Sequence, residues 1–591
     1  MTYDDWPNLA TMFFDIAGQY GDRPFLWDKL DGSYVPRNWA SIADEVRALS
    51  AGLRETGVES GDRVVLVAEN GTNWVIADLA IIAAGAITVP AYTTNTEALH
   101  EHVLNDSGAR LAIVSTAALA KRLLPACTKA GTPTVIAIDE VPASNGVEVV
   151  AWSDILVRGA ESAGGVEARA AEVGRKDTAC FIYTSGTGGM PKGVILSHHA
   201  VLSNIESIYL AYKPLLSGID TFLSFLPLSH SYEHTAGLYF PISIGAEIYY
   251  AEGADTLINN MPEARPTIMT CVPRLYEVMR QRILAGVNRQ GGKKKQFFER
   301  AVTLGTKRIN GERLSLIERV QDRVLDKLVR SKVRERFGGR LNALVSGGAP
   351  LNPDVGLFFS SLGLTLLQGY GQTESAPVVS CNLPDRIKMD TVGHPLPGVE
   401  VRIADDGEIL VRGGLLMDGY WNNPETTAET IKDGWLHTGD IGEFDSNGYL
   451  KITDRKKDLI VNSGGDNIAP QRVEGILNLE PEIAQAVVVG DRRPYLAALI
   501  VPDDAYLVEF AKRHNLSPRL INVTDEPALL SEIRAAVDRA NQTLSAIEKV
   551  KRVMIASEAF TVDNGQMTPT MKVRRHAVKE VYGTALDSLY G

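Results

Sequence analysis

Apolar strand-like runs alternate with helix-like segments through the first part of the chain. Residues 62–70 (DRVVLVAEN) and 87–92 (ITVPAY) have the length and the β-branched content of buried strands. The segment between them, 72–85, has the composition of a buried helix, and strand-like runs return at 111–115 and 134–138. Because parallel strands are joined by helical crossovers, this order predicts an α/β fold with a parallel, helix-covered sheet.

A second unit of the same kind follows, and after it the pattern changes. Its strand candidates are residues 222–227, 247–251, 267–273 and 341–348. From about Thr391 the chain has short strand-like runs joined by tight turns. The dipeptides Asp406-Gly407 and Asn447-Gly448 are typical of β-hairpins, so we expect a small β-barrel here.

The last part of the chain is a compact α+β pattern. We therefore expect a large N-terminal domain, residues 1–453, with two βαβ-type sheets and the small β-barrel. A small, mobile α+β C-terminal domain, residues 454–591, should follow it. The length of 591 residues agrees with more than one domain, because single hydrophobic cores stop growing at about 250–300 residues.

Composition excludes several classes of protein. The hydrophobic fraction of 45% and the charged fraction of 22% are those of a soluble globular protein, and a net charge of −12 argues against nucleic acid as a partner. Four widely spaced cysteines without a CxxC pair indicate reduced thiols and no zinc site. The first residues lack a signal-peptide pattern, and no apolar run reaches the ~18 residues of a membrane span, so a cytoplasmic location is expected.

A basic helical insert interrupts the second unit, at about residues 282–340. Its helical pattern places Leu314, Ile317, Val324 and Leu328 on one face, opposite a face rich in Arg and Lys. One interpretation is a solvated helix that packs this apolar face on the domain. The other is a basic amphipathic surface that makes peripheral contact with anionic lipid, at the inner face of the membrane.

The segment 183–198, YTSGTGGMPKGVILSH, combines glycines, hydroxyl side chains and one lysine. It follows a strand-like run at 178–183, and a short strand at 194–196 precedes a helix for which Ser197 is the expected N-cap. Glycine-rich backbone, hydroxyls and a cation are all suited to a phosphate group. The Walker pattern is absent, because Pro191 and Gly193 flank Lys192. The alternative is a mobile surface turn, and His198 and His199 are expected on the surface.

Further segments at strand ends carry side chains suited to a nucleotide. Residues 344–354 (LVSGGAPLNPD) offer glycines for close approach to a flat ligand, and residues 366–377 (LLQGYGQTESAP) offer an aromatic ring, a hydroxyl and the Mg²⁺-type ligand Glu374. Asp440, in GWLHTGDIGE, can accept both hydroxyls of a ribose. Residues 454–470 add Arg455, Lys457 and a glycine-rich turn.

Together these segments resemble the acyl-adenylate-forming (AMP-binding) superfamily over about residues 15–575. The matching motifs are YTSGTGGMPKGV, LPLSHSYEH, VSGGAPL, GYGQTE, HTGD, DRKKDLIVNSGGDNIAP and MTPTMK. The basic insert and the ending TPTMKVRR are most similar to the long-chain fatty acid–CoA ligase branch. The resemblance implies that a fatty acid reacts with ATP to an acyl-adenylate, which then reacts with CoA. It leaves the acyl chain length and the oligomeric state open.

The resemblance also implies a role for each matching residue. Mg²⁺ is expected as the cofactor, held by Thr184 and Glu374, while Lys192, His230 and Lys572 are the expected catalytic residues. Glu233 and His234 are expected to be packing residues. The expected nucleotide-binding residues are Thr184, Ser185, Gly186, Thr187, Lys192, Gly347, Gly348, Ala349, Gln368, Gly369, Tyr370, Gly371, Thr373, Asp440 and Arg455.

The resemblance further implies a hinge at Lys457 and a passage for CoA beside Gly464 and Gly465. Two positions depart from the pattern common in the family. Gly188 stands where a threonine is common in the phosphate loop, and Met571 stands where many relatives have glycine before the catalytic lysine. Because Thr184, Thr187 and Lys192 remain, we expect an altered but active loop.

Two other functions compete with the CoA ligase. A fatty acyl-AMP ligase would pass the acyl group to a carrier protein, but the extra insertion typical of such enzymes is not found between LVSGGAPL and HTGD. A catalytically silent homologue would only bind acyl-adenylate or acyl-CoA, but the chain retains Lys192, Glu374, Asp440, Arg455 and Lys572.

Overall fold

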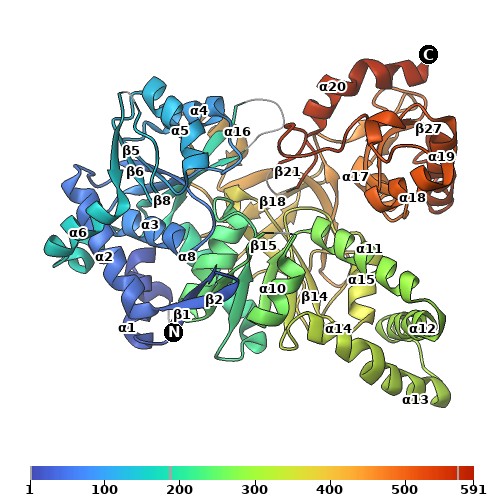
Figure 1. The fold of residues 1–591 in the computed structure, drawn as a ribbon, viewed down its shortest axis with the longest axis horizontal. Helices are drawn as coiled ribbons and strands as arrows, with labels where there is room; N and C mark the ends of the chain where they lie inside the picture. The colour runs from blue at the N-terminus through green and yellow to red at the C-terminus, as the bar shows by residue number, and fades with distance from the viewer. Residues whose placement is uncertain (1–2, 145, 185–189, 254, 569–570) are drawn as a thin grey trace.

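The computed structural model describes residues 3–591 except 145, 185–189, 254 and 569–570. Figure 1 shows a large body that holds the N-terminal three quarters of the chain and a smaller C-terminal lobe beside it. The α/β architecture of a large N-terminal part with two sheets and a smaller C-terminal part is confirmed. No helix among the described residues is both long and apolar enough to cross a lipid bilayer.

The first sheet has eight strands in the order β19-β9-β8-β4-β3-β5-β6-β7. The strands from β8 to β7 are parallel to their neighbours, as the sequence predicts. Their bounds are β3 Arg63–Val67, β4 Ile87–Pro90, β5 Leu111–Val114, β6 Thr134–Ala137, β7 Glu148–Ala151, β8 Thr178–Thr184, β9 Lys192–Ser197 and β19 Gly419–Tyr420. The helices of this unit are α1 Leu9–Tyr20, α2 Trp39–Glu55, α3 Thr72–Ala83, α4 Glu97–Ser107, α5 Ala117–Ala130, α6 Trp152–Ser162, α7 Val166–Ala170 and α8 His198–Tyr212.

The second sheet has nine strands in the order β16-β15-β14-β13-β12-β10-β11-β1-β2. Its centre, from β14 to β1, is parallel, and antiparallel strands complete both edges. The bounds are β1 Pro24–Leu30, β2 Ser33–Asn38, β10 Thr221–Ser224, β11 Glu247–Tyr250, β12 Ile268–Cys271, β13 Ala343–Ser346, β14 Leu366–Gly371, β15 Val378–Cys381 and β16 His394–Pro395. Its helices include the π-helical η3 Glu233–Tyr239, α9 Phe240–Ser243, α10 Leu257–Ala264 and α15 Pro353–Ser361.

The small β unit is a five-stranded antiparallel sheet. Its strands are β17 Glu400–Ile403, β18 Glu408–Arg412, β20 Ile431–Lys432, β21 Trp435–Phe444 and β22 Leu450–Arg455. Both predicted hairpins are present, with Gly407 and Gly448 at φ +83° and +80°. These left-handed conformations explain why glycine follows Asp406 and Asn447. No ladder among the described residues joins the edge strands into a closed barrel.

The C-terminal lobe has its own hydrophobic core. The main core of the body ends with Leu450, and a separate cluster of buried residues begins at Ile460. The predicted boundary at 453/454 lies between these two cores and stays a prediction. The lobe contains β23 Ile460–Val461, β24 Asn467–Ile468, α17 Pro470–Leu477, β25 Ile483–Val489, β26 Leu496–Pro502, α18 Asp504–His514, α19 Pro527–Ala540, β27 Val550–Ile555 and α20 Arg575–Asp587.

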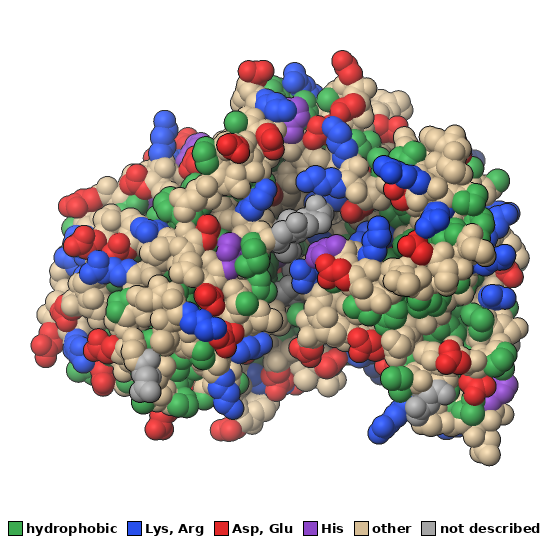
Figure 2. Space-filling model, turned by 90° about the horizontal axis from the view of Figure 1, so that it is seen from above, with side chains coloured by type: hydrophobic (Ala, Val, Ile, Leu, Met, Phe, Trp, Pro, Cys, Tyr) green, Lys and Arg blue, Asp and Glu red, His purple; other side chains and the backbone are tan. Residues whose placement is uncertain are grey.

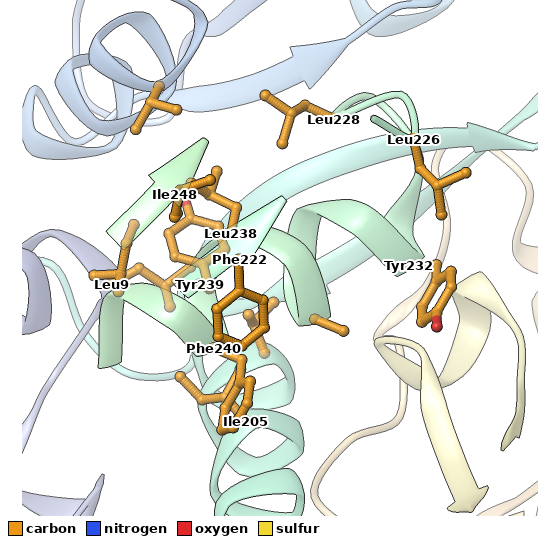
Figure 3. Packing of buried hydrophobic residues seen from close by; sticks show 14 of the residues in the cluster. Leu9, Ile205, Phe222, Leu226, Leu228, Tyr232, Leu238, Tyr239, Phe240 and Ile248 are labelled. Atoms are coloured by element: carbon orange, nitrogen blue, oxygen red, sulfur yellow. The ribbon is translucent and has the colours of Figure 1, made fainter. Parts of the chain in front are cut away.

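The body's core fills the space between α8 and the second sheet. Figure 3 shows Phe222 of β10 and Phe240 of α9 stacked above Ile205 of α8, with Tyr232 to one side. The two phenyl rings meet edge to face, with their centroids 6.1 Å apart, an arrangement that aromatic pairs favour. This packing fixes the side of the second sheet that faces α8.

The start of α8 confirms one prediction and contradicts another. Ser197 is the N-cap, and its hydroxyl accepts a hydrogen bond from the Ala200 N–H. His198 is buried, so its expected surface position is wrong: the Leu9 N–H of α1 donates to its Nδ1. The reason is that α1 covers the beginning of α8. The residue pattern within 197–212 contains no information about this contact.

The insert is helical, but its apolar face does not pack on the domain. It contains α11 Pro273–Gln290, α12 Gly292–Ile309, α13 Leu316–Leu325, the π-helical η4 Asp326–Arg330 and α14 Ser331–Arg336. Leu314 packs inward, against the cluster of Ala301, Leu304 and Leu325. Ile317, Val324 and Leu328 are exposed to solvent instead.

Arg330 fastens the insert to the body. Its guanidinium is fully buried and donates to the Asp322 carboxylate at 2.6 Å, to the Ala301 carbonyl at 2.8 Å and to the Ser361 carbonyl at 2.8 Å. It thereby joins η4, α13, α12 and α15. A buried charge is tolerated when it is paired and its hydrogen bonds are satisfied, and Arg330 meets both conditions.

We predict that Arg330→Ala lowers the free energy of unfolding by about 3–5 kcal/mol, because it removes the buried partner of the Asp322 carboxylate, leaving only the 3.5 Å contact with Arg308, and the hydrogen bonds to two carbonyls. Arg336→Ala, at an exposed position in the same insert, should change it by less than about 0.5 kcal/mol. Urea unfolding of the full chain measures both values. Equal small effects would contradict the fastening role of Arg330.

Candidate active site

A cavity of about 1540 Å³ lies where the second sheet, the small β unit and the C-terminal lobe meet. Figure 2 shows a hollow between two masses of the molecule, with Lys, Arg and His side chains around it. The predicted residues that line the cavity come from both sheets, the small β unit and the lobe: Thr184, Lys192, His230, Gly347, Gly348, Ala349, Gln368, Gly369, Tyr370, Gly371, Thr373, Glu374, Asp440, Arg455, Lys457 and Lys572.

The remaining five predicted positions need separate description. Ser185, Gly186 and Thr187 lie outside the described residues. Gly464 and Gly465 are described, but they form an exposed turn between β23 and β24 and do not line the cavity. The hydrogen bonds from the Gly464 and Asp466 N–H groups to the Asn462 side chain hold this turn.

The described ends of the glycine-rich segment are fixed by a β-ladder. Strands β8 and β9 are antiparallel, and Thr184 and Lys192 are the last pair of Cα partners before the loop. The ladder therefore brings a hydroxyl and an ammonium group to the same end of the sheet. Phosphate binding by this segment stays a prediction.

Two side chains that the sequence analysis did not single out join this segment to Glu374. The Lys192 ammonium lies over the Tyr420 ring, 5.4 Å from its centroid, and donates to the Thr426 hydroxyl at 3.4 Å. The Tyr420 hydroxyl donates to Glu374 Oε1 at 2.8 Å. Tyr420 lies on β19, a strand of two residues that pairs with β9. A strand of two residues has no detectable periodicity, so the sequence offered no signal for Tyr420.

Glu374 and Thr184 are suited to Mg²⁺ as part of a larger ligand set. Among the described residues no group of three or more His, Cys, Asp or Glu side chains could hold a metal by itself. Mg²⁺ in phosphate-transfer sites is typically held by one or two protein ligands together with substrate phosphates and water. One carboxylate and one hydroxyl facing the same cavity fit that donor set.

Glycines allow close packing of the cavity wall. A Cβ atom on Gly371 would lie 1.8 Å from the Pro377 carbonyl oxygen, which no side chain can tolerate. A Cβ atom on Gly347 would lie 3.0 Å from the Tyr232 ring. Glycine at these two positions therefore lets Pro377 and Tyr232 pack directly against the backbone at the ends of β14 and β13.

Asp440 connects the cavity wall at β14 to the last strand of the small β unit, β22. Its Oδ2 accepts from the Tyr370 hydroxyl at 2.7 Å, and its Oδ1 accepts from Arg455 Nε at 3.0 Å. Asp440 and Arg455 are also Cα partners in the ladder of β21 and β22. Burial and the Asp440 charge raise the pKa of Tyr370, so this phenol remains a neutral donor. Each carboxylate oxygen has two lone pairs and can still accept a ligand hydroxyl.

Lys572 reaches the cavity from the C-terminal lobe. The residue is exposed to the cavity, and the residues that line the cavity surround its side chain. Burial and the charge of Arg455 lower its pKa to about 8, against the opposing effect of Asp440. A backbone turn holds it: the Thr568 N–H donates to the Lys572 carbonyl at 2.8 Å. Met571, before it, has φ +61°, a conformation that is strained for any residue except glycine.

His230 is a neutral imidazole at physiological pH. Burial, with a smaller contribution from the charge of Lys572, lowers its pKa to about 3. The Tyr232 N–H donates to its Nδ1 at 3.2 Å, so the ring proton resides on Nε2. His230 can therefore donate a hydrogen bond into the cavity without adding charge.

The segment after His230 is held by two buried networks. The Glu233 carboxylate accepts from the hydroxyls of Ser224 and Thr270, both at 2.6 Å, and burial raises its pKa to about 7. His234 bonds to Asp78 of α3 at 3.0 Å. Glu233 and His234 are both buried, which agrees with their predicted packing role.

A group of apolar residues on and beside α8 forms one part of the cavity wall, which we call the apolar branch. These residues are aromatic or aliphatic, and polar side chains such as Thr184, Lys192 and Asp440 line other parts of the cavity. Such a combination suits a ligand with a long apolar part and a polar head. The branch is lined by Ile208, Tyr212, Leu215, Phe222, Ala236, Phe240 and Ile268.

Comparison with known proteins identifies the family. A family model described as "AMP-binding enzyme" matches residues 13–421, and one described as "AMP-binding enzyme C-terminal domain" matches residues 457–591. The chain belongs to the AMP-binding enzyme family. Among curated relatives of this AMP-binding enzyme, the "Long-chain-fatty-acid--CoA ligase FadD15" of Mycobacterium bovis is 35% identical over 599 residues, which cover 100% of this chain and 98% of that protein.

Other relatives and solved structures agree with this membership. The "Long chain acyl-CoA synthetase 7, peroxisomal" of Arabidopsis thaliana is 30% identical over 630 residues, covering 100% of this chain and 87% of that protein. The adenylation domain of a carboxylate reductase from Mycobacterium chelonae has a TM-score of 0.78 at 22% identity, with 99% of this chain and 91% of that chain covered. The anthranilate CoA ligase AuaEII in complex with anthranoyl-AMP has a TM-score of 0.74 at 20% identity, covering 99% and 100%. These two structures show that the fold is shared.

We predict that Lys572 reacts with an amine-directed acylating reagent at pH 8 at least about tenfold faster than Lys579, because a pKa of about 8 leaves half of its amine neutral. Lys579 is an exposed lysine on α20 and serves as the internal standard. Peptide mass spectrometry measures both rates on the same sample. Equal rates would contradict the lowered pKa.

Proposed function

We propose that this AMP-binding enzyme is a long-chain fatty acid–CoA ligase. It activates a fatty acid with ATP to an acyl-adenylate and then transfers the acyl group to CoA, giving acyl-CoA, AMP and pyrophosphate. The observation that carries the proposal is the position of Lys572 in a cavity that has a polar, glycine-lined part and an apolar branch. The similarity to FadD15 over the full chain supports the same activity.

In the first step a carboxylate oxygen attacks the α-phosphorus of ATP, and pyrophosphate leaves. Both reactants are anions, so the step requires positive charge and oriented donors at the point where they meet. Lys572 supplies a cation from the lobe, and His230 supplies a neutral N–H from the body. Lys192, at the base of the glycine-rich segment, supplies a cation for the β- and γ-phosphates.

The nucleotide occupies the polar part of the cavity. Asp440 accepts hydrogen bonds from the ribose hydroxyls, and the glycine-lined wall of β13 and β14 receives the adenine beside Tyr370. Thr184 and Glu374 hold Mg²⁺, which neutralises phosphate charge when it is bound. The fatty acyl chain lies in the apolar branch, where burial of each CH₂ group contributes about 0.8 kcal/mol.

In the second step the CoA sulfur attacks the acyl carbon, the thiol proton is released, and AMP leaves with the bonding electrons. Lys572 is not needed for this step, whereas the exposed turn at Gly464 and Gly465 is the expected passage for the pantetheine arm. Since that turn does not line the cavity in the present arrangement, the part of the lobe that follows Lys457 rotates relative to the body between the steps.

The hinge of this rotation is Lys457, in the turn directly after β22. The present arrangement is held across the boundary by a hydrogen bond from the Asn352 amide to the Gly475 carbonyl at 2.9 Å. Neutral hydrogen bonds of this kind contribute only about 0.5–1.5 kcal/mol each. The lobe can therefore leave this arrangement without breaking a strong interaction at this point.

The enzyme is expected to work in the cytoplasm, on a fatty acid, ATP and CoA, and in peripheral contact with the inner face of the membrane. Four buried cysteines that form no disulfide among the described residues support a reducing compartment. Nucleic acid is not expected as a partner, given the net charge of −12.

Assaying AMP release and thioester formation with carboxylates from acetate to oleate tests the proposal. CoA-dependent thioester formation that increases with chain length supports it. Pyrophosphate release without thioester would indicate an enzyme that loads a carrier protein. No turnover with any carboxylate would indicate a silent homologue.

We predict that Lys572→Ala lowers the rate of adenylate formation by a factor of about 100 or more, because it removes the cation where two anions meet. Thioester formation from supplied acyl-adenylate and CoA should remain within about threefold of wild type. Pyrophosphate exchange and thioester assays measure the two steps separately. Exchange at the wild-type rate would contradict the assignment.

We predict that Lys457→Pro retains adenylate formation but loses most CoA-dependent thioester formation, because proline fixes φ near about −65° and so restricts rotation at this residue. Lys456→Ala, at the neighbouring exposed position, is the control and should retain both steps. Loss of both steps in Lys457→Pro would indicate misfolding, which thermal unfolding would reveal. Retention of both steps would exclude rotation about this residue.

A further inference from the structure

Exposed apolar side chains form a ridge along α13 and η4. Helix α13 lies at the outer edge of the molecule (Figure 1). From the second member onward the side chains of the ridge are spaced three or four residues apart, and the first precedes the second directly, so they form one continuous stripe on a helix. Their side chains are between 48% and 80% exposed, although all are large and aliphatic. We call this stripe the α13 ridge; it consists of Leu316, Ile317, Val320, Val324 and Leu328.

The acidic residues of the same helical segment are already paired with cations. Glu318 accepts from Lys307 at 3.0 Å, and Asp322 binds the buried Arg330 at 2.6 Å. Asp326 pairs with Arg334 at 3.0 Å. The negative charges of this segment are therefore neutralised within the insert.

The basic residues beside the ridge are exposed and lack such partners. Arg319, Arg323 and Lys327 lie between the ridge positions, and Arg313 and Lys332 lie just before and after them. Among the described residues none of these five makes an ion pair, whereas other cations of the insert do. The outward face thus combines apolar side chains with unpaired positive charge.

The charge of the insert opposes that of the rest of the chain. Residues 282–340 contain 17 Lys and Arg and 6 Asp and Glu, a net charge of +11, so the remaining chain carries −23. A partner for this face must accept apolar side chains and carry negative charge. A second copy docked ridge to ridge would place the same unpaired cations against one another, which is unfavourable.

We propose that the α13 ridge is a docking surface for an anionic lipid bilayer. The helix lies in the plane of the interface: the aliphatic side chains enter the boundary between headgroups and acyl chains, and Arg319, Arg323 and Lys327 contact lipid phosphates. Arg330 and the capping box between Ser315 and Glu318 hold the helix in this orientation before contact.

The ridge is separate from the cavity, since none of its residues lines it. The proposal therefore does not depend on the ligase activity, and vesicle binding can be measured without any turnover. The proposal assigns the expected peripheral contact of the enzyme with the membrane to a defined surface and to anionic lipids.

Sedimentation with vesicles of phosphatidylcholine, with and without phosphatidylglycerol, tests the proposal on the full chain. Wild type should bind the anionic vesicles and bind the neutral ones at least about tenfold more weakly, because each cation contributes roughly fivefold at an anionic surface. Arg319→Gln/Arg323→Gln should lower the affinity for anionic vesicles by roughly 20-fold.

The apolar contribution is tested by Ile317→Gln/Val320→Gln, which should weaken binding to the anionic vesicles at least about tenfold. Val157→Gln is the matched control, since Val157 is 68% exposed on α6 in another part of the molecule. All variants should retain the wild-type melting temperature.

Binding by the two ridge variants that equals wild type would overturn the proposal, as would a wild type that does not bind anionic vesicles. Gel filtration of wild type and of the ridge variant measures their oligomeric state, which also decides the proposal. A dimeric wild type that becomes monomeric in Ile317→Gln/Val320→Gln would mean that a second copy covers the ridge, and this would also overturn the proposal.

Discussion

The carboxylate of Asp440, shared by Tyr370 and Arg455, is the interaction on which the arrangement of the site depends. Tyr370 belongs to β14 of the second sheet, and Arg455 is the last residue of β22, where the chain leaves the small β unit for the lobe. The Asp440 side chain therefore holds β14, the small β unit and the start of the lobe in fixed positions relative to one another. The cavity exists because these three parts meet at this point.

Local sequence patterns predicted much of the fold and of the candidate site. The predictions that failed concern residues whose position depends on contacts with distant parts of the chain. Buried parallel strands, glycine-containing hairpins and the Ser197 cap depend on neighbouring residues, so the sequence predicts them. Tyr420 reaches the site through a two-residue strand, and His198 is buried by α1, 189 residues earlier. Periodicity within one segment contains no information about such partners.

The same reason explains the insert. Its amphipathic pattern was correctly predicted, but the pattern does not say which face meets the body. The structure turns Asp322 and Arg330 inward as a hydrogen-bonded pair and leaves the aliphatic side chains outside. A buried arginine among a row of surface cations has no distinguishing feature in the sequence, because its role is set by carbonyl groups of α12 and of the residue that ends α15.

The opposite charges of the insert and the remaining chain give the molecule a large electric dipole. In the field of a charged surface such a dipole experiences a torque before any contact is made, and the torque acts over about one Debye length, ~8 Å at physiological salt. The end that carries α13 therefore arrives first at a negative surface, while the acidic remainder is turned away. The uneven distribution of charge thus selects an orientation. The net charge of the whole chain, −12, does not reveal this distribution.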